Sequence, residues 1–165
     1  MTYDLLFIRR RSGMTLLEAF DERAAGYDPD AELALMSVNE EQRAVWERIM
    51  QRITTSIGPV TSEEYPYSLT LWRDGAAGHL QLDYDGDSAS VEIPYRYSGE
   101  GALSMATEAY RIAHIVEEES GLTGFDFQTD RPTTPGDVRR AAARLGGITD
   151  WAQENLTGGG GAGQQ

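Results

Sequence analysis

Residues 102–128, ALSMATEAYRIAHIVEEESGLTGFDFQ, decide the fold because they hold the densest apolar periodicity of the chain. Apolar side chains recur here at steps of three and four residues, which is the spacing of one helix face. Gly121 is expected to end this helix, since glycine is the usual left-handed cap. Phe125 and Phe127, which flank Asp126, then predict a short strand. The apolar stripe consists of Leu103, Met105, Ala106, Ala109, Tyr110, Ile112, Ala113, Ile115 and Val116.

The rest of the chain is predicted to supply the sheet on which this helix lies. Residues 3–10 are apolar on both faces beyond their first positions, a pattern that favours an interior strand. Between residues 66 and 97 the period changes to two, which predicts three half-buried strands. Asp-Gly dipeptides at 74–75 and 85–86 are turn signals, and they join these strands into an antiparallel meander.

A two-residue turn at positions 85–86 also predicts the register of the last two meander strands. It pairs Leu82 with Ala89, so that inward side chains meet inward partners. The same register places His79 opposite Glu92 on the polar face, with Trp72 beside them. This arrangement could orient a general base. An exposed cross-strand pair, with no catalytic role, is the alternative interpretation.

Capping signals predict two helices before the meander. Thr15 and Glu18 have the spacing of a capping box and open a helix over residues 16–25. Ser37 and Glu40 repeat that spacing before a second long helix, which ends near residue 57. Asp-Pro at 28–29 predicts one or two helical turns within residues 27–35. The first helix is expected to point inward with Leu16, Leu17, Phe20 and Ala24.

The chain is predicted to end in a broken helix and a tail. Thr134-Pro135 opens a helix that runs to Leu145, where Gly146-Gly147 is expected to interrupt it before a short continuation over 151–156. The fold class is therefore α+β, with one domain over residues 1–156 and a disordered glycine-rich tail over 157–165. The sheet is expected to have about five mostly antiparallel strands, the meander 66–97 plus strands near 3–9 and 123–128, with helices packed mainly on one face.

The composition narrows the classes of function. The 165 residues carry a formal net charge of −13, lysine is absent, and all fourteen basic residues are arginines. Such a surface repels nucleic acid and anionic membranes and favours either a basic protein partner or simple solubility. Because the basic cluster of the first segment follows its apolar run, a secretory signal is not indicated, and a cytoplasmic location is expected. The arginine, alanine and glycine usage is typical of a GC-rich bacterial genome.

Motifs specific to an enzyme class are missing from the sequence. It has no cysteine, so disulfides, thiolate metal sites and cysteine nucleophiles are excluded. The segment DYDGD at 83–87 lacks the spacing of a calcium loop, because position twelve of such a loop would be Pro94. His114 has no third ligand nearby in sequence, so neither a metal nor a cofactor is predicted.

The acidic run at residues 117–119 lies in the last turn of the long helix, where the helix dipole disfavours negative charge. Arg111 or Arg131 could offset that charge within the chain. Alternatively, the run could serve a basic partner, and a solvated helix end would also tolerate it.

Short motifs resemble a diffuse set of small uncharacterised bacterial proteins, some of which look like immunity proteins of toxin systems. The resemblance covers Tyr3-Asp4-Leu5 at the start, and the late helix with its E-x-x-G-L ending and apolar strand. Those proteins end their core with a tyrosine-aspartate-proline-glutamine strand, where this chain has Phe125-Asp126-Phe127-Gln128. The resemblance implies an interaction function and transfers no site residues.

The sequence thus predicts a non-catalytic, acidic interaction protein, with an immunity-type inhibitor of a basic toxin as the leading hypothesis. A small-molecule binder or hydrolase that uses the polar sheet face is the alternative, and a homodimer that pairs exposed sheet faces or edges is a third hypothesis. The candidate partner-binding residues are Trp72, His79, Asp83, Glu92, Glu117, Glu118 and Glu119.

Overall fold

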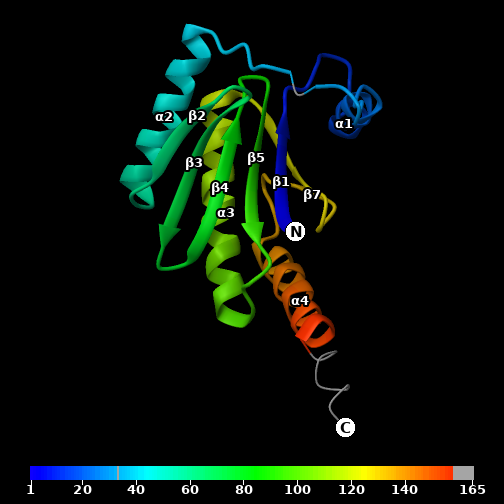
Figure 1. Ribbon diagram of the computed structural model, residues 1–165, viewed down its shortest axis with the longest axis vertical. Helices are drawn as coiled ribbons and strands as arrows, with labels where there is room; N and C mark the ends of the chain where they lie inside the picture. Colours follow the sequence, from blue (N-terminus) through cyan, green and yellow to red (C-terminus); the bar gives the residue numbers. More distant parts are fainter. Residues whose placement is uncertain (33, 158–165) are drawn as a thin grey trace.

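The computed structural model describes residues 1–32 and 34–157, and in them one antiparallel sheet lies against a layer of helices (Figure 1). The predicted glycine-rich tail falls almost entirely outside these residues. The strands are β1 Thr2–Ile8, β2 Thr61–Tyr65, β3 Ser68–Gly75, β4 Gly78–Tyr84, β5 Ser88–Pro94, β6 Thr123–Asp126 and β7 Arg131–Pro132. The helices are α1 Leu16–Ala25, α2 Glu40–Ser56, α3 Gly99–Ser120 and α4 Val138–Thr157.

The strand order is β2-β3-β4-β5-β1-β6-β7. β1 pairs with both β5 and β6, which confirms the interior strand that its two apolar faces predicted. The described part of the sheet has seven strands where about five were expected. The two additional strands are the edges, β2 and β7. β2 reads TSEEY and is almost fully exposed, and β7 has two residues, so neither shows the alternation that reveals a strand.

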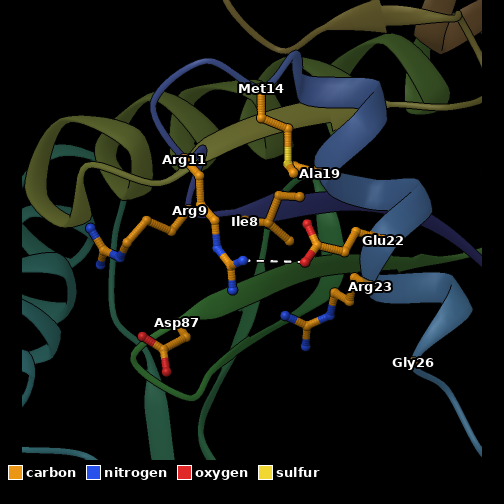
Figure 2. A pocket seen from close by; sticks show the side chains of 9 residues that line it. All are labelled: Ile8, Arg9, Arg11, Met14, Ala19, Glu22, Arg23, Gly26 and Asp87. Atoms are coloured by element: carbon orange, nitrogen blue, oxygen red, sulfur yellow. Dashed lines mark hydrogen bonds and ion pairs between the residues drawn. The ribbon is translucent and has the colours of Figure 1, made fainter.

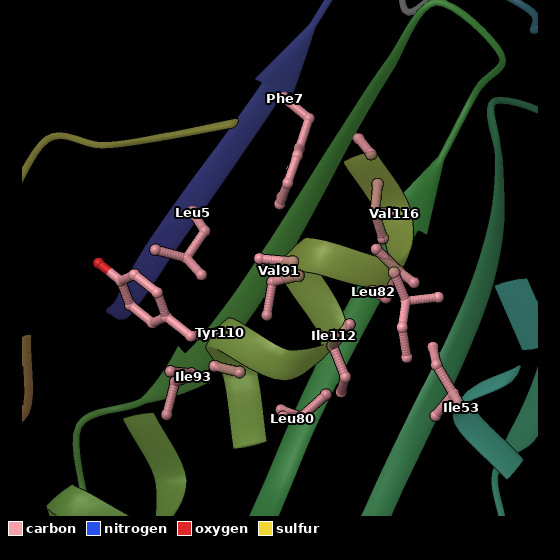
Figure 3. Packing of buried hydrophobic residues seen from close by; sticks show 14 of the residues in the cluster. Leu5, Phe7, Ile53, Leu80, Leu82, Val91, Ile93, Tyr110, Ile112 and Val116 are labelled. Atoms are coloured by element: carbon pink, nitrogen blue, oxygen red, sulfur yellow. The ribbon is translucent and has the colours of Figure 1, made fainter. Parts of the chain in front are cut away.

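The long helix α3 covers the inner face of the sheet, as predicted, and forms the centre of the core (Figure 3). Gly121 caps it in the left-handed conformation, with φ of +74°, and donates its N–H to the carbonyl of Glu117. The predicted burial of Leu103 is wrong, because this side chain is 37% exposed. Ala102, one residue earlier, is buried instead. α2 and α4 flank α3 and contribute buried side chains to the same core.

α1 is the exception to the one-sided helix layer. Its Phe20 packs edge-on against Phe127, with ring centroids 5.1 Å apart, and also contacts Phe125 on the outer side of β6. The predicted capping box of Thr15 is confirmed. Of the predicted inward side chains, Leu16 and Phe20 are half-buried, whereas Leu17 is 48% exposed and Ala24 is exposed, and the buried residue of α1 is Ala19. α1 therefore lies loosely over one end of the outer sheet face.

The register of β4 and β5 differs by two residues from the prediction. Leu82 pairs with Val91, not with Ala89, and Tyr84 takes Ala89 as its partner. Because side chains alternate with a period of two, this shift leaves every side chain on its predicted face.

The cause of the shift is the position of the turn, which lies at Gly86-Asp87. The N–H of Asp85 donates to the carbonyl of Ser88 at 3.0 Å and closes a two-residue turn. The carboxylate of Asp85 accepts from the backbone N–H groups of Asp87 and Ser88, which fixes the turn further. Gly86 has φ of +96°, a conformation that glycine adopts without strain.

Three helix predictions are corrected by the structure. α2 is capped by Asn39 with Gln42, not by Ser37 with Glu40, and it starts at residue 40. The described residues of the segment 27–35 contain no helix and only a single hydrogen-bonded turn, which the N–H of Ala31 closes on the carbonyl of Asp28. α4 continues through Gly146-Gly147 without a break, because the helix packs on α3 there: an added Cβ at Gly146 would meet the side chain of Ala102 at an ordinary contact distance of 3.6 Å.

Two buried polar clusters fix α3 on the sheet. Asp126 of β6 is fully buried, and one of its oxygens accepts hydrogen bonds from Tyr3 at 2.7 Å and from Tyr110 at 2.5 Å. On the opposite side of α3, Glu108 pairs with Arg73 of β3 at 3.3 Å, and both residues are 8% exposed. The hydrogen bonds to Asp126 tie β1, β6 and α3 together, and burial together with the Asp126 carboxylate raises the pKa of both tyrosines.

Candidate functional site

The outer face of the sheet carries the polar residues that the alternation predicted. α3 runs behind the central strands in Figure 1, on the inner side. α1 reaches the outer face at β6, where Phe20 meets Phe125 and Phe127, and at the start of β5, where Arg23 donates to the hydroxyl of Ser88. Cross-strand pairing arranges the outer side chains in rows. One row consists of Thr61, Trp72, Gln81, Glu92 and Asp4, and the next consists of Glu63, Thr70, Asp83, Ser90 and Leu6.

Carboxylates dominate this face. Asp4, Glu63, Asp74, Asp83 and Glu92 occupy outer positions of β1 to β5, and none of the outer positions of these fully described strands holds an arginine. We call this surface the acidic face and define it by these five residues.

Asp4 and Glu92 lie directly opposite each other on β1 and β5. Partial burial, and after it the neighbouring carboxylates of Asp83 and Asp4, raise the pKa of Glu92 above its ordinary value. Like charges directly opposite each other destabilise a pair of strands. The acidic face therefore holds negative charge at a cost to the folded state.

An aromatic group lies beside these acids. The indole N–H of Trp72 donates to the side-chain oxygen of Gln81 at 2.9 Å, and the Gln81 amide donates to Asp83 at 2.9 Å. The ring of Tyr65 meets that of Trp72 edge-on, with centroids 6.3 Å apart. Both rings are half-buried in the face. Gln81 therefore links the indole of Trp72 to the carboxylate of Asp83.

His79 does not join Glu92, and the predicted pair is wrong. The observed register puts Gln81 opposite Glu92 and pairs His79 with Asp74 of β3. The imidazole Nδ1 lies 2.7 Å from the Asp74 carboxylate, at the exposed end of the hairpin. The hollow on this sheet face lies at the opposite end, between Phe20 and Ser90, and neither His79 nor Trp72 lines it.

The acidic run of α3 has partners within the chain. Glu119 accepts from Arg48 at 2.9 Å and from Arg52 at 3.3 Å, and Arg52 also lies 2.8 Å from Glu118. Glu117 accepts from Thr133 and Thr134. The arginines that offset this charge come from α2, and they are not Arg111 or Arg131, the two that the sequence suggested. The run lies on the helix layer and is not part of the acidic face.

A second feature, an arginine-lined hollow between α1 and the β4–β5 turn, was not predicted (Figure 2). Its volume is about 540 Å³. Arginine side chains reach it from the end of β1 and from α1. The lining residues are Ile8, Arg9, Arg11, Met14, Ala19, Glu22, Arg23, Gly26 and Asp87.

The signal for this hollow in the sequence was the run Arg9-Arg10-Arg11 in an acidic chain. In the sequence this cluster indicates only that the first segment is not a secretory signal. The missing information was tertiary: α1 folds back beside β1 and brings Arg23 to the same place as Arg11.

The remaining findings concern relatives of the chain, metal sites and membrane-spanning helices. No protein family, curated protein or solved structure matches this chain. Within residues 1–32 and 34–157, no group of three or more histidines and carboxylates is placed to hold a metal ion. In the same residues, no helix has the length and apolar character needed to cross a membrane.

Proposed function

We propose that this chain is a non-catalytic interaction protein that binds a basic protein through its acidic face, as an immunity-type inhibitor binds a basic toxin. The observation that carries the proposal is the direct opposition of Asp4 and Glu92 on neighbouring strands, with Asp83 beside them. In β1 to β5, which the structure describes in full, no outer position holds an arginine. Carboxylates in this arrangement repel one another. A partner's lysines or arginines would relieve the repulsion and gain charge-assisted hydrogen bonds.

The aromatic residues of the acidic face support the same partner chemistry. Trp72 and Tyr65 are held in place by hydrogen bonds and ring contact, so little side-chain freedom would be lost on binding. Tryptophan and tyrosine are common energetic anchors of interfaces, and their ring faces attract arginine and lysine. Acids for steering and aromatic rings for anchoring therefore occupy one surface.

Residues 117–119 contribute less to this proposal than the sequence suggested. Their carboxylates already interact with Arg48, Arg52 and two threonines. A partner cation would have to displace these groups. By contrast, the charged neighbours that help burial to raise the pKa of Glu92 are the acids Asp83 and Asp4.

The alternative function, small-molecule binding or hydrolysis around Trp72, His79 and Glu92, has weaker support. His79 and Glu92 lie in different rows of the sheet, and the hollow on this face has other lining residues. Small-molecule sites are normally concave and gather their polar groups in one cavity.

The experiment is affinity capture from a lysate of the native host with three versions of the chain. The face variant carries Asp4→Asn, Asp83→Asn and Glu92→Gln. The control variant carries Glu47→Gln, Asp150→Asn and Glu154→Gln, which remove the same charge from exposed positions of α2 and α4. Each bait is washed at low and at high salt.

The proposal expects one basic protein to be retained by the wild type and by the control variant, lost from the face variant, and released by salt. A partner retained equally by the face variant and the control would place the interface elsewhere. Equal loss from both variants would show a response to net charge alone, and would contradict a specific face.

A further inference from the structure

The arginine-lined hollow lies apart from the acidic face and has a different chemistry. Figure 2 shows the guanidinium groups of Arg11 and Arg23 in the space between α1 and the β4–β5 turn, while that of Arg9 is turned outward. We propose that this hollow binds a small carboxylate that carries an apolar group.

The arginine donors in the hollow are only partly used. Arg11 is 3.2 Å from Glu22, in a pair whose side chains are 75% and 52% exposed. Arg23 donates to the hydroxyl of Ser88 at 3.0 Å and lies 4.0 Å from Asp85. A guanidinium group has five N–H donors in a planar fork that fits a carboxylate in a bidentate manner. Both arginines therefore retain donors for an incoming anion.

Glu22 already shows the interaction that a ligand would make. Its carboxylate occupies Arg11 from within the chain (Figure 2). Exposed ion pairs of this kind contribute little to stability, so a ligand carboxylate can replace Glu22 at small cost. Glu22 thus acts as a displaceable competitor for Arg11.

The charge of the lining selects the class of anion. Arg11 and Arg23 reach into the hollow beside the carboxylates of Glu22 and Asp87, while Arg9 is turned outward, so the lining has no excess of positive charge. A carboxylate brings one negative charge to this lining, whereas a phosphate dianion brings two and is repelled more strongly by Glu22 and Asp87. Carboxylates are therefore favoured over phosphates at this site.

The remaining lining explains the apolar group. Ile8, Met14 and Ala19 form the apolar part of the wall, and Ile8 and Ala19 are buried. Figure 2 shows the Met14 side chain extending toward Ala19 on the side of the hollow away from Asp87. A short alkyl chain beside these residues would leave water while its carboxylate stays at Arg11 and Arg23.

The test is a titration of the full chain with sodium hexanoate, followed by amide chemical shifts at constant ionic strength. Hexanoate is expected to shift the amides of residues 8–26 and of the β4–β5 turn in a saturable manner. Arg11→Gln and Arg23→Gln should each weaken binding by about tenfold, because each removes a charged donor. Glu22→Gln should strengthen binding by about threefold, because it removes the competitor. The control is Arg43→Gln, an exposed arginine paired with Glu64 on the far edge of the sheet, which should leave the affinity unchanged.

The affinity for hexanoate is expected to fall in the arginine variants and to rise in the glutamate variant. These opposite changes distinguish a site from nonspecific binding. Binding of hexanol at the same sites with equal affinity would overturn the role of the arginines. Inorganic phosphate binding more tightly than hexanoate would overturn the carboxylate assignment. Equal weakening by Arg43→Gln, or no saturable shift, would show that the hollow is not a binding site.

Discussion

The carboxylate of Glu119, near the end of α3, lies 2.9 Å from Nε of Arg48 on α2. This ion pair joins two helices whose residues are 71 positions apart in sequence. It explains how a helix C-terminus tolerates negative charge, because the guanidinium offsets the repulsion from the helix dipole. Arg48, and with it Arg52, lowers the pKa of Glu119 below its ordinary value.

Replacing Glu119 with glutamine is expected to reduce stability at pH 7 by less than about 1 kcal/mol, since the pair is partly exposed. Because the folded-state pKa is lowered, the stabilisation is present above the unfolded-state pKa and is lost as the pH falls through the folded-state pKa. Urea unfolding of both proteins at neutral and at acidic pH measures the effect. A difference of the same size at both pH values would contradict the ion-pair explanation.

Replacing Glu92 with glutamine is expected to change stability in the opposite direction. The change removes a like-charge contact with Asp4, and should raise stability at pH 7 by a few tenths to about 1 kcal/mol. The raised pKa means that Glu92 holds a proton more readily in the folded state than in the unfolded state. The stability of the wild type therefore falls as the pH rises from the ordinary glutamate pKa through the raised one. The gain from glutamine is therefore expected above the raised pKa and should vanish below the ordinary glutamate pKa.

Urea midpoints across this pH range measure that gain. A destabilising Glu92→Gln would show that the carboxylate has a favourable partner in the fold. A stabilising change that also abolishes partner capture would show that Glu92 is retained for binding at the expense of stability.

The sequence predicted those parts of the fold that depend on local periodicity. The stripe of α3 identified a helix with one buried face, and alternation sorted the residues of β3 to β5 between two faces. These patterns depend only on burial, which repeats with the geometry of the element. Strand β2 has no such pattern, because both of its faces are exposed at the sheet edge.

Partners that are distant in sequence could not be predicted in the same way. Nothing local indicates that Arg48 would meet Glu119, or that Arg23 would lie beside the end of β1. The cross-strand partner of His79 depends on where the β4–β5 turn begins. The carboxylate of Asp85 fixes that position, because it accepts a hydrogen bond from the backbone of the turn. Asp83 and Glu92 were therefore predictable from the sequence as members of the polar sheet face, whereas Glu63 of the unpredicted strand β2 and the pairing of these residues were not.

Gly147 in α4 offers a test of the unbroken helix. No atom lies within 4 Å of the place where an added Cβ would sit, so Gly147→Ala should stabilise the protein by about 1 kcal/mol through helix propensity. Gly124 is the contrasting position, because its Cβ would collide with Thr133 and with the ring of Phe7. Gly124→Ala should destabilise by at least about 1 kcal/mol. Thermal unfolding of both variants measures the contrast. A destabilising Gly147→Ala would indicate that the helix breaks there, as the sequence had suggested.

Asp126 is the most buried acid of the chain, and the geometry gives it a structural role. Tyr3, Tyr110 and the backbone N–H groups of two following residues all donate to its carboxylate. Tyr110→Phe should destabilise by about 2 kcal/mol, because it removes a hydrogen bond to a buried charged group. Tyr67→Phe, at a position 47% exposed, is the matched control and should change stability by less than about 0.5 kcal/mol.

Urea unfolding of the single variants and of the Tyr3→Phe, Tyr110→Phe double variant measures the coupling through Asp126. The two hydroxyls share one carboxylate oxygen, so their effects should not be additive. If Tyr110→Phe were as harmless as Tyr67→Phe, the carboxylate would be satisfied without it, and Asp126 would become a candidate for a functional role. Additive losses would show that the hydroxyls act independently. A non-additive loss would establish that one buried acid joins β6 and α3 to β1, the strand that carries Asp4 of the acidic face.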